Sequence, residues 1–215
     1  RLVPERGDEL RKTCEAIRAE VLAAGVKTRD GAQVLAAMFE NAEIDAASLL
    51  AFTSDFLPAD LARATRQKVE EVLGEGELTF RNETLRAQGE GAFLLCSFWL
   101  VNHLIKEGEI ARAQELLDGL LRRASPLGLL SEEIDSASGN FLGNFPQAFS
   151  HLGLIGTILN LDLVRRRPES ARWSDHERFA KTVGPTVGLR GVLAGFWRVP
   201  KTLSLLFVSR SKWRA

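Results

Sequence analysis

The chain has 215 residues and a mass of 23.7 kDa, the size of one domain or slightly more. With 45% apolar and 26% charged residues, its composition is that of an ordinary soluble protein and excludes a disordered or low-complexity chain. No apolar run approaches the ~20 residues that span a bilayer, so no transmembrane segment is predicted.

The net charge of zero hides an uneven distribution of charge along the chain. From residue 165 onward, twelve basic residues stand against three acidic ones, so residues 165–215 carry +9 and residues 1–164 carry −9. We therefore separate a body, 1–164, from a basic tail, 165–215, which contains Gly, Pro and Trp and has the pattern of a short amphipathic helix at 189–197. The tail could fold against the acidic body or dock on an anionic membrane or nucleic acid. We prefer the first interpretation, and no nucleic-acid partner is expected.

Helical periodicity dominates the body. The predicted helices are, in chain order, 10–21 with Gly25 as its cap, 44–52, 58–73, 90–106, 109–123 and 145–164. The segment 90–106 is apolar nearly all round, which is typical of a helix buried on all sides, and 145–164 is mostly apolar and is expected to be an inner helix. The helix at 109–123 has one apolar stripe and is otherwise charged, as expected of an outer helix. No convincing strand appears, although 26–39 and 77–81 are ambiguous.

Amphipathic helices therefore alternate with wholly apolar ones, which predicts three pairs of outer and inner helices in concentric layers. Three such pairs would form half of a ring. Two loops, 74–91 and 124–144, each lead from an outer helix into an inner one, and we expect a site at their shared end. The second loop is longer than a compact domain needs, which is typical of a functional loop.

Three carboxylates lie in that second loop, in GLLSEEID (128–135). A solvated acidic turn is one interpretation, and a general base is the other. Two neighbouring segments add weight to the second: GEGAFLLCSFWLV (89–101) and GNFPQAFSHLGLI (143–155). In this order and spacing, the three segments closely resemble glycoside hydrolase family 15, which includes glucoamylases, glucodextranases and bacterial trehalases. The resemblance covers about residues 1–164.

The resemblance implies an all-α fold, roughly the C-terminal half of an (α/α)6 toroid. It also implies hydrolysis of an α-glucosidic bond with inversion, in which one glutamate is the general acid and another the general base. The family's base lies in a motif that Ser131-Glu132-Glu133-Ile134-Asp135 matches, so Glu132 is the expected base and Glu133 an expected substrate or structural contact. Whether the substrate is trehalose, a maltooligosaccharide or another glucoside stays open.

The proton donor of the family lies in a Trp-Glu-x-Arg motif, and none of the four tryptophans here is followed by Glu. The resemblance therefore implies a fragment that lacks the general acid and needs the missing N-terminal half of the barrel as its partner. Alone, such a fragment is expected to be inactive. The alternative is a non-catalytic helical binding or interaction protein derived from such an enzyme.

Several other residues have both a structural and a functional interpretation. Glu90 could favour a helix N-terminus or bind a sugar hydroxyl, and Arg81 could form a salt bridge or bind substrate. Gln147 could point into the site or into a loop. Asn144 is expected to be a helix N-cap, and His151 a core histidine held by a backbone carbonyl.

The two cysteines, Cys14 and Cys96, both fall on apolar helix faces, and we expect them to be inert buried thiols. Such low cysteine usage favours a reducing compartment, and no signal peptide is apparent, so the expected location is cytoplasmic. The chain begins with Arg, and we expect the true N-terminus to lie upstream. His103 and His176 have no partners in the sequence, so neither a metal site nor a cofactor is predicted.

Overall fold

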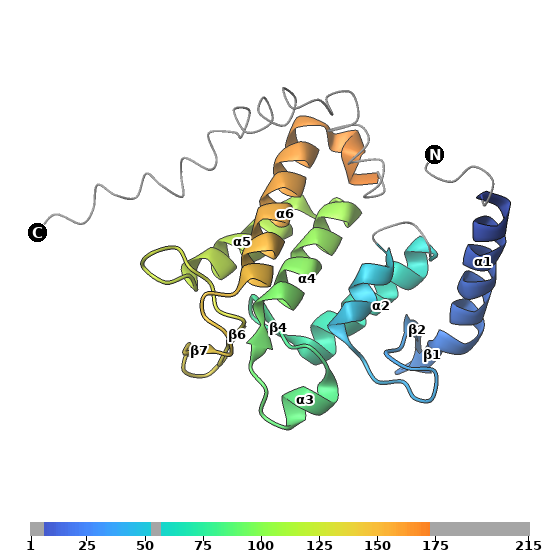
Figure 1. The fold of residues 1–215 in the computed structure, drawn as a ribbon, viewed down its shortest axis with the longest axis horizontal. Coiled ribbons are helices and arrows are strands. Elements are labelled where there is room, and N and C mark those ends of the chain that lie inside the picture. The colour runs from blue at the N-terminus through green and yellow to red at the C-terminus, as the bar shows by residue number, and fades with distance from the viewer. Residues whose placement is uncertain (1–6, 53–56, 173–215) are drawn as a thin grey trace, which may run out of the picture. The chain divides into compact units, whose positions relative to one another are not determined.

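The computed structural model describes residues 7–52 and 57–172, which belong to one compact unit, Arg1–Arg172 (Figure 1). The predicted basic tail and its helix at 189–197 lie almost entirely outside the described residues. The helical elements are α1 (Gly7–Glu20), η2 (Val21–Gly25), η3 (Ala46–Phe52), α2 (Ala59–Leu73), α3 (Glu83–Ala87), α4 (Leu94–Glu107), α5 (Ile110–Arg122), α6 (Ala148–Arg166) and η4 (Pro168–Arg172). The strands are β1 (Val26–Arg29), β2 (Ala32–Leu35), β3 (Gly74–Glu75), β4 (Leu78–Thr79), β5 (Ala92–Phe93), β6 (Glu133–Ile134) and β7 (Phe141–Leu142).

The helices lie close to where the periodicity predicts them. The segment 44–52 is a 3-10 helix, η3, and the other five predicted helices are α1, α2, α4, α5 and α6. The largest shift is at the start of α4, which begins at Leu94 instead of residue 90. The reason is that Ala92 and Phe93 pair with β6 before the chain turns into the helix. Among the described residues, no helix is long and apolar enough to cross a membrane.

Helix α4 lies at the centre of the unit and packs against α5 and α6. Its buried residues, among them Leu94, Phe98 and Leu104, cover most of the circumference of the helix. The side that carries Leu95, Trp99 and Asn102 is only partly buried, so the prediction of a helix buried on all sides is wrong for that side. Asn102 of α4 donates to Thr157 Oγ1 (2.7 Å) and accepts from Asn160 Nδ2 (2.8 Å), both on α6. These bonds satisfy amide groups between two apolar helices, where an unpaired polar group would be costly.

Helix α5 shows the opposite distribution. Its buried positions are Ala113, Leu117 and Leu120 on one side and Gly119, which lies against Glu77, whereas the charged residues face outward. This single buried stripe is the pattern predicted for an outer helix.

Helix α1 has no buried residue, and the prediction that Cys14 is buried is therefore wrong. The apolar spacing is present, but Leu10 and Ile17 stay about half exposed because none of the described elements packs closely on that face. Cys96 is buried, as expected. A periodic stripe predicts which face of a helix is apolar, whereas burial depends on whether another element covers it.

The small sheets join segments that the sequence leaves as loops. Strands β1 and β2 form an antiparallel hairpin within the ambiguous segment 26–39, turning at Asp30 and Gly31, both with positive φ. Strands β5, β6 and β7 form a three-stranded antiparallel sheet that was not predicted. Each of these strands has only two residues, too few for an alternating pattern. This sheet holds the end of the loop 74–91 beside the loop 124–144, where a shared site is expected.

Candidate active site

The β5–β6–β7 sheet places the predicted carboxylates where α4 and α6 begin (Figure 1). In the register of the sheet, Glu133 lies opposite Phe93 on one side and Leu142 on the other. Leu94 N, at the start of α4, donates to Glu132 O (3.1 Å), and Gln147 N, at the start of α6, donates to Leu130 O (2.9 Å). The loop 128–135 is thus tied to both helix N-termini.

Glu132 is held by Asn144 from the neighbouring segment. Its Oε2 atom accepts two hydrogen bonds from Asn144, from the backbone N (2.9 Å) and from Nδ2 (2.8 Å). In return, Glu132 N donates to Asn144 O (2.9 Å). The prediction that Asn144 caps α6 is wrong, because its side chain is used on the carboxylate, and Gln147 is the N-cap instead.

Gly143 allows this close approach. Its φ is +68°, and a Cβ atom there would lie 2.8 Å from Glu132 Oε2 and 3.0 Å from Glu132 Cβ. Glycine is the residue that adopts this left-handed conformation at little cost. The GN pair at 143–144 therefore determines the surroundings of one carboxylate oxygen of Glu132.

Glu133, the second carboxylate, accepts a hydrogen bond from Gly91 N (3.1 Å) at its Oε2 atom. Burial, together with the negative charges of Glu90 and Glu132, raises the pKa of Glu133 above its ordinary value, and the Gly91 N–H only partly offsets this. Three glutamates are thus close enough to interact electrostatically.

Arg81 and Glu90 are paired with each other. The two bonds are Arg81 Nη2 to Glu90 Oε1 (2.5 Å) and Nε to Oε2 (3.3 Å), and the Arg81 guanidinium lies over the Phe93 ring at 5.0 Å. The salt-bridge interpretation of Arg81 is confirmed. Glu90 lies before β5 and not in the first turn of α4, so the helix N-terminus interpretation of Glu90 is wrong. Arg81 is still partly exposed, which leaves part of its guanidinium accessible.

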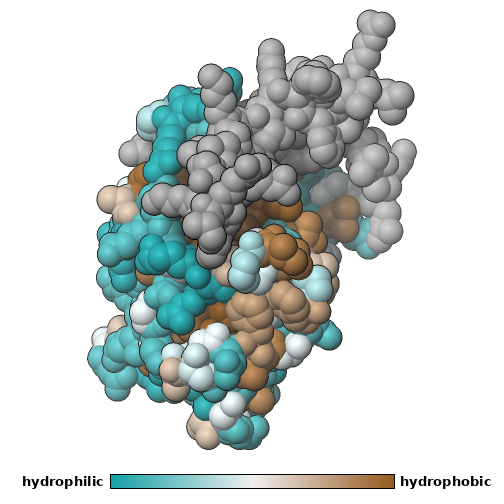
Figure 2. Space-filling view, turned by 90° about the vertical axis from the view of Figure 1, so that its left-hand side faces the viewer, coloured by the Kyte–Doolittle hydropathy of each residue, from teal (hydrophilic) through white to brown (hydrophobic). Residues whose placement is uncertain are grey.

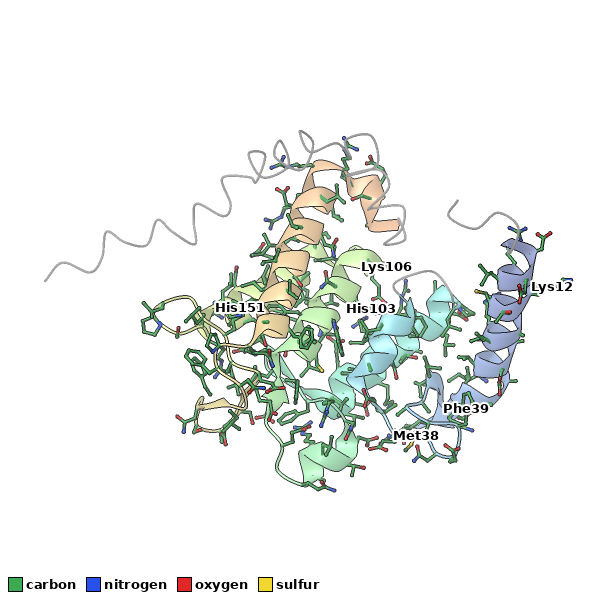
Figure 3. All side chains as sticks on the ribbon, in the orientation of Figure 1. Lys12, Met38, Phe39, His103, Lys106 and His151 are labelled. Carbon is green, nitrogen blue, oxygen red and sulfur yellow. The ribbon has the colours of Figure 1, made fainter. Side chains whose placement is uncertain are left out.

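Gln147 and His151 lie on the first turns of α6. The Gln147 side chain accepts from Phe149 N (3.4 Å), and its backbone O lies 2.7 Å from His151 Nδ1. His151 Nε2 faces Leu130 N at 3.3 Å. Figure 3 shows His151 where α6 meets the loops. His151 is held by backbone groups, as predicted, and the Gln147 side chain is engaged in the cap.

The sequence interpretation missed two features of this site. Asn144 was read only as a cap, although it lies in the NFP segment that carries the resemblance. Phe141 and Phe145 stack with ring centroids 5.1 Å apart, and both rings are partly exposed. The two residues are four apart in the sequence. That spacing would indicate a ring contact only if the chain between them were known to reverse direction.

The third carboxylate of the motif, Asp135, has a local role. Its Oδ1 atom accepts from Ala137 N (3.0 Å) and Ser138 N (2.7 Å), and the hydrogen bonds from Ser138 lower the pKa of Asp135. Asp135 thus closes the turn that returns the chain from β6 to β7. Within 7–52 and 57–172, no group of three or more His, Cys, Asp or Glu side chains is placed to hold a metal ion.

Comparison with known sequences and structures identifies relatives. The profile of "Glycosyl hydrolases family 15" matches residues 110–159. A trehalase of Mycolicibacterium smegmatis is 42% identical over 168 residues, covering 75% of this chain and 25% of the relative. A trehalase of Mycobacterium tuberculosis is 37% identical over 168 residues (75% and 24%), and one of Thermoplasma volcanium 39% identical over 153 residues (69% and 24%).

Solved structures show the fold. A wild-type glycosidase is similar with a TM-score of 0.64 at 22% identity, covering 74% of this chain and 46% of that one. A glycosidase variant in complex with glucose has the same TM-score at 20% identity. The fold is therefore that of an (α/α)6 toroid, of which this chain contains part. The chain spans about a quarter of the length of the curated relatives it matches. The chain is thus similar to part of a family 15 glycosyl hydrolase.

Proposed function

We propose that this chain is part of an inverting glycoside hydrolase that cleaves trehalose, with Glu132 as the general base. The observation that carries the proposal is the hydrogen bonding of the two Glu132 carboxylate oxygens. Both hydrogen bonds from Asn144 go to Oε2, and none of the described residues donates a hydrogen bond to Oε1. A carboxylate fixed through one oxygen, with the other available, is arranged to accept a proton from water. The curated relatives, all named trehalases, support trehalose as the substrate.

In the proposed reaction, Glu132 removes a proton from a water molecule while the water oxygen attacks C1 of one glucosyl unit. The bond from C1 to the bridging oxygen breaks, and that oxygen takes a proton from a general acid. Attack from the opposite face inverts the configuration at C1, and room for the water requires the two carboxyl groups to be about 6.5–9.5 Å apart. We assign the general acid to the part of the enzyme outside this chain.

The neighbouring side chains are proposed to bind the sugar. Glu133, Glu90, Arg81 and Gln147 all lie on the segments joined by the β5–β6–β7 sheet or at the first turn of α6. The Arg81–Glu90 pair offers both donors and acceptors to hydroxyl groups. Because the guanidinium is already neutralised by Glu90, we expect it to orient a neutral sugar and not to attract an anion.

The test is a chimera in which this chain replaces the aligned quarter of the M. smegmatis trehalase. Its products from trehalose and maltose are followed by proton NMR at the anomeric signals. Inverting cleavage of trehalose releases α-glucose and β-glucose in equal initial amounts, whereas retention releases only α-glucose. Retention, or a folded chimera that hydrolyses neither sugar, would contradict the proposal. The second result would favour the non-catalytic binding protein.

A cytoplasmic location is also part of the proposal. Cys14 is exposed and Cys96 is buried, and neither forms a disulfide. Burial raises the pKa of the Cys96 thiol, which keeps it unreactive. An exposed free thiol such as Cys14 is compatible with a reducing compartment.

A further inference from the structure

A cavity of about 350 Å³ lies between α2 and α4, away from the candidate active site. Helix α4 begins at Leu94, which contacts Glu132, and rises about 14 Å before it reaches His103 in the wall of the cavity. Figure 3 shows His103 and Lys106 on the side of α4 that faces α2. This volume is at the lower end of the range for ligand sites, so it suits a molecule of few heavy atoms.

His103 is a buried side chain without a hydrogen bond. It is 5% exposed, and neither ring nitrogen has a hydrogen-bond partner among the described residues. Glu107 Oε1 lies 3.5 Å from Nδ1 and is also unpartnered there, whereas Glu107 Oε2 accepts from Arg66 Nε (2.9 Å). Because a buried polar group without a partner is costly, the imidazole indicates a ligand that supplies the missing hydrogen bond.

The charged side chains that line the cavity favour an anion. Arg63 of α2 and Lys106 of α4 are both part of the lining, and Arg63 is exposed to solvent. Glu107 is the negative side chain among the described lining residues, and its salt bridge with Arg66 neutralises it. The lining therefore carries an excess of positive charge close to His103.

The rest of the lining is apolar. It consists of Phe52, Leu57, Ala59, Ala62 and Ala171, and the Phe52 ring meets His103 edge-on with centroids 5.8 Å apart. These side chains can pack against hydrocarbon but offer no hydrogen bonds to the many hydroxyl groups of a sugar. The combination of cations, one unpartnered imidazole and an apolar wall matches a small organic anion.

This cavity differs from the apolar surface on another side of the unit. Figure 2 looks onto the side where α5 and α6 lie, and apolar side chains gather there in a band. An uncovered face of that kind is expected of a chain that covers 46% of the glycosidase with the same fold. An apolar helix laid over the cavity would leave the nitrogens of His103 without partners, so partial coverage of the fold does not explain them.

We propose that this cavity is a second binding site of the chain and that its ligand is a small monocarboxylate with a short hydrocarbon body. The hydrocarbon packs on the apolar wall, and the carboxylate accepts a hydrogen bond from His103 Nε2–H near the positive charges of Arg63 and Lys106. The inference rests on this cavity alone and does not depend on the proposed hydrolysis.

Binding of the carboxylate takes up a proton from solution. A neutral imidazole has one N–H group, whereas the bound ring needs two, one for the ligand and one for Glu107 Oε1. The charged groups that face the ring are Arg63 from α2 and Lys106 and Glu107 from α4, with Arg66 acting through Glu107, while η3 and η4 contribute the uncharged Phe52 and Ala171. The affinity is therefore expected to fall as the pH rises from 6 to 8.

The first experiment is calorimetric titration of the full chain with sodium butyrate. We expect one site with a dissociation constant of about 1 mM, the scale for a ligand of so few atoms. Butyramide, which has the same shape without the charge, and sulfate, which has the charge without the hydrocarbon, are each expected to bind at least about tenfold more weakly. Titrations in two buffers of different ionisation enthalpy measure the proton uptake.

Two variants separate binding from folding. His103→Leu is expected to abolish butyrate binding without lowering the Tm, because it removes two unpartnered nitrogens from a buried position. Arg63→Ala is expected to weaken binding by about tenfold, and its exposed position makes it harmless to folding. Arg122→Ala, an exposed arginine of α5 outside the cavity, is the matched control and should bind butyrate like the parent chain.

NMR signals of the imidazole rings locate the bound ligand. Butyrate is expected to shift the signals of His103 and to leave those of His151, at the start of α6, unchanged. The proposal would be overturned by the absence of butyrate binding, by equal binding of butyramide or sulfate, or by unchanged binding in the His103→Leu or Arg63→Ala variant. Shifts at His151 instead of His103 would assign the ligand to the candidate active site and overturn it as well.

Discussion

Glu132 and Asn144 hold each other through both backbone and side chain. The Glu132 N–H bonds to the Asn144 carbonyl, and both N–H groups of Asn144 bond to one Glu132 oxygen. The hydrogen bond from Glu132 N to Asn144 O fixes the distance between the two loop segments. The two hydrogen bonds from Asn144 to Oε2 determine which carboxylate oxygen of Glu132 is engaged.

Glu132→Gln in the chimera is expected to lower kcat for trehalose by at least about 100-fold, because an amide cannot accept the proton from water. The geometry should persist, since the amide oxygen can still accept from Asn144, and KM should change little. Steady-state kinetics measures both. Glu115→Gln, on the exposed side of α5, is the control. Full activity of Glu132→Gln would remove Glu132 from the role of base.

Asn144→Ala removes the Nδ2 hydrogen bond to the Glu132 carboxylate and keeps the backbone one. It is expected to lower kcat about tenfold with a loss of about 1 kcal/mol in unfolding free energy. Asn144→Asp should be worse for kcat, because it places a second negative charge beside Glu132. Urea unfolding and kinetics on the chimera measure the two effects. Asn140→Ala, an exposed residue in the same loop, is expected to behave as the parent protein. Equal activity of the Asp and Ala variants would contradict the electrostatic account.

Gly143→Ala and Gly139→Ala form a matched pair. Both glycines have positive φ, +68° and +75°, so both variants carry a similar backbone cost of about 1 kcal/mol. Only at Gly143 would the new methyl meet Glu132, whereas the nearest atom at Gly139 is Arg123 Nη1 at 3.7 Å. Gly143→Ala should therefore lose more stability in urea and more activity. Identical losses would show that the approach to Glu132 is not constrained.

Arg66→Ala is expected to destabilise the chain by about 3 kcal/mol, because it removes the buried guanidinium that neutralises three partly buried carboxylates. The Arg66 side chain is 3% exposed and contacts Glu70, Glu107 (2.9 Å) and Glu109 (3.2 Å). Burial acts to raise the pKa of Glu107, but His103 and Arg66 outweigh it and keep that pKa below the ordinary value. Arg112→Ala, with a side chain 48% exposed, should cost less than about 1 kcal/mol. Urea denaturation compares the two.

Glu83 makes the stability of the hairpin region depend on pH. Its hydrogen bond from Arg29 lowers the Glu83 pKa, with help from Ile44 N and against the effect of burial. A depressed folded-state pKa contributes stability above the unfolded value near 4.5, and that stability is lost as pH falls through the folded value. Glu83→Gln is therefore expected to cost about 1 kcal/mol at pH 7 and nothing at pH 2–3. Urea unfolding at several pH values checks this, and a constant difference across them would contradict it.

The positions of the helices, and the single buried stripe of α5, follow from the sequence alone. Apolar spacing is a local property, and α2, α4, α5 and α6 are long enough to display it. The expectation that both long loops end at one place also came from the order of helices. The carboxylate motif came from the resemblance, and the structure places Glu132 and Glu133 together at the helix N-termini.

The tertiary structure decided what these residues contact. The partner of Asn144 is twelve positions away, and a sheet of two-residue strands joins them, so no period in the sequence reports the contact. Burial was decided in the same way: Cys14 and Cys96 both lie on apolar helix faces, but only Cys96 has neighbours that cover it. Periodicity specifies the face that a helix would bury, and only the packing of distant segments determines whether that face is covered.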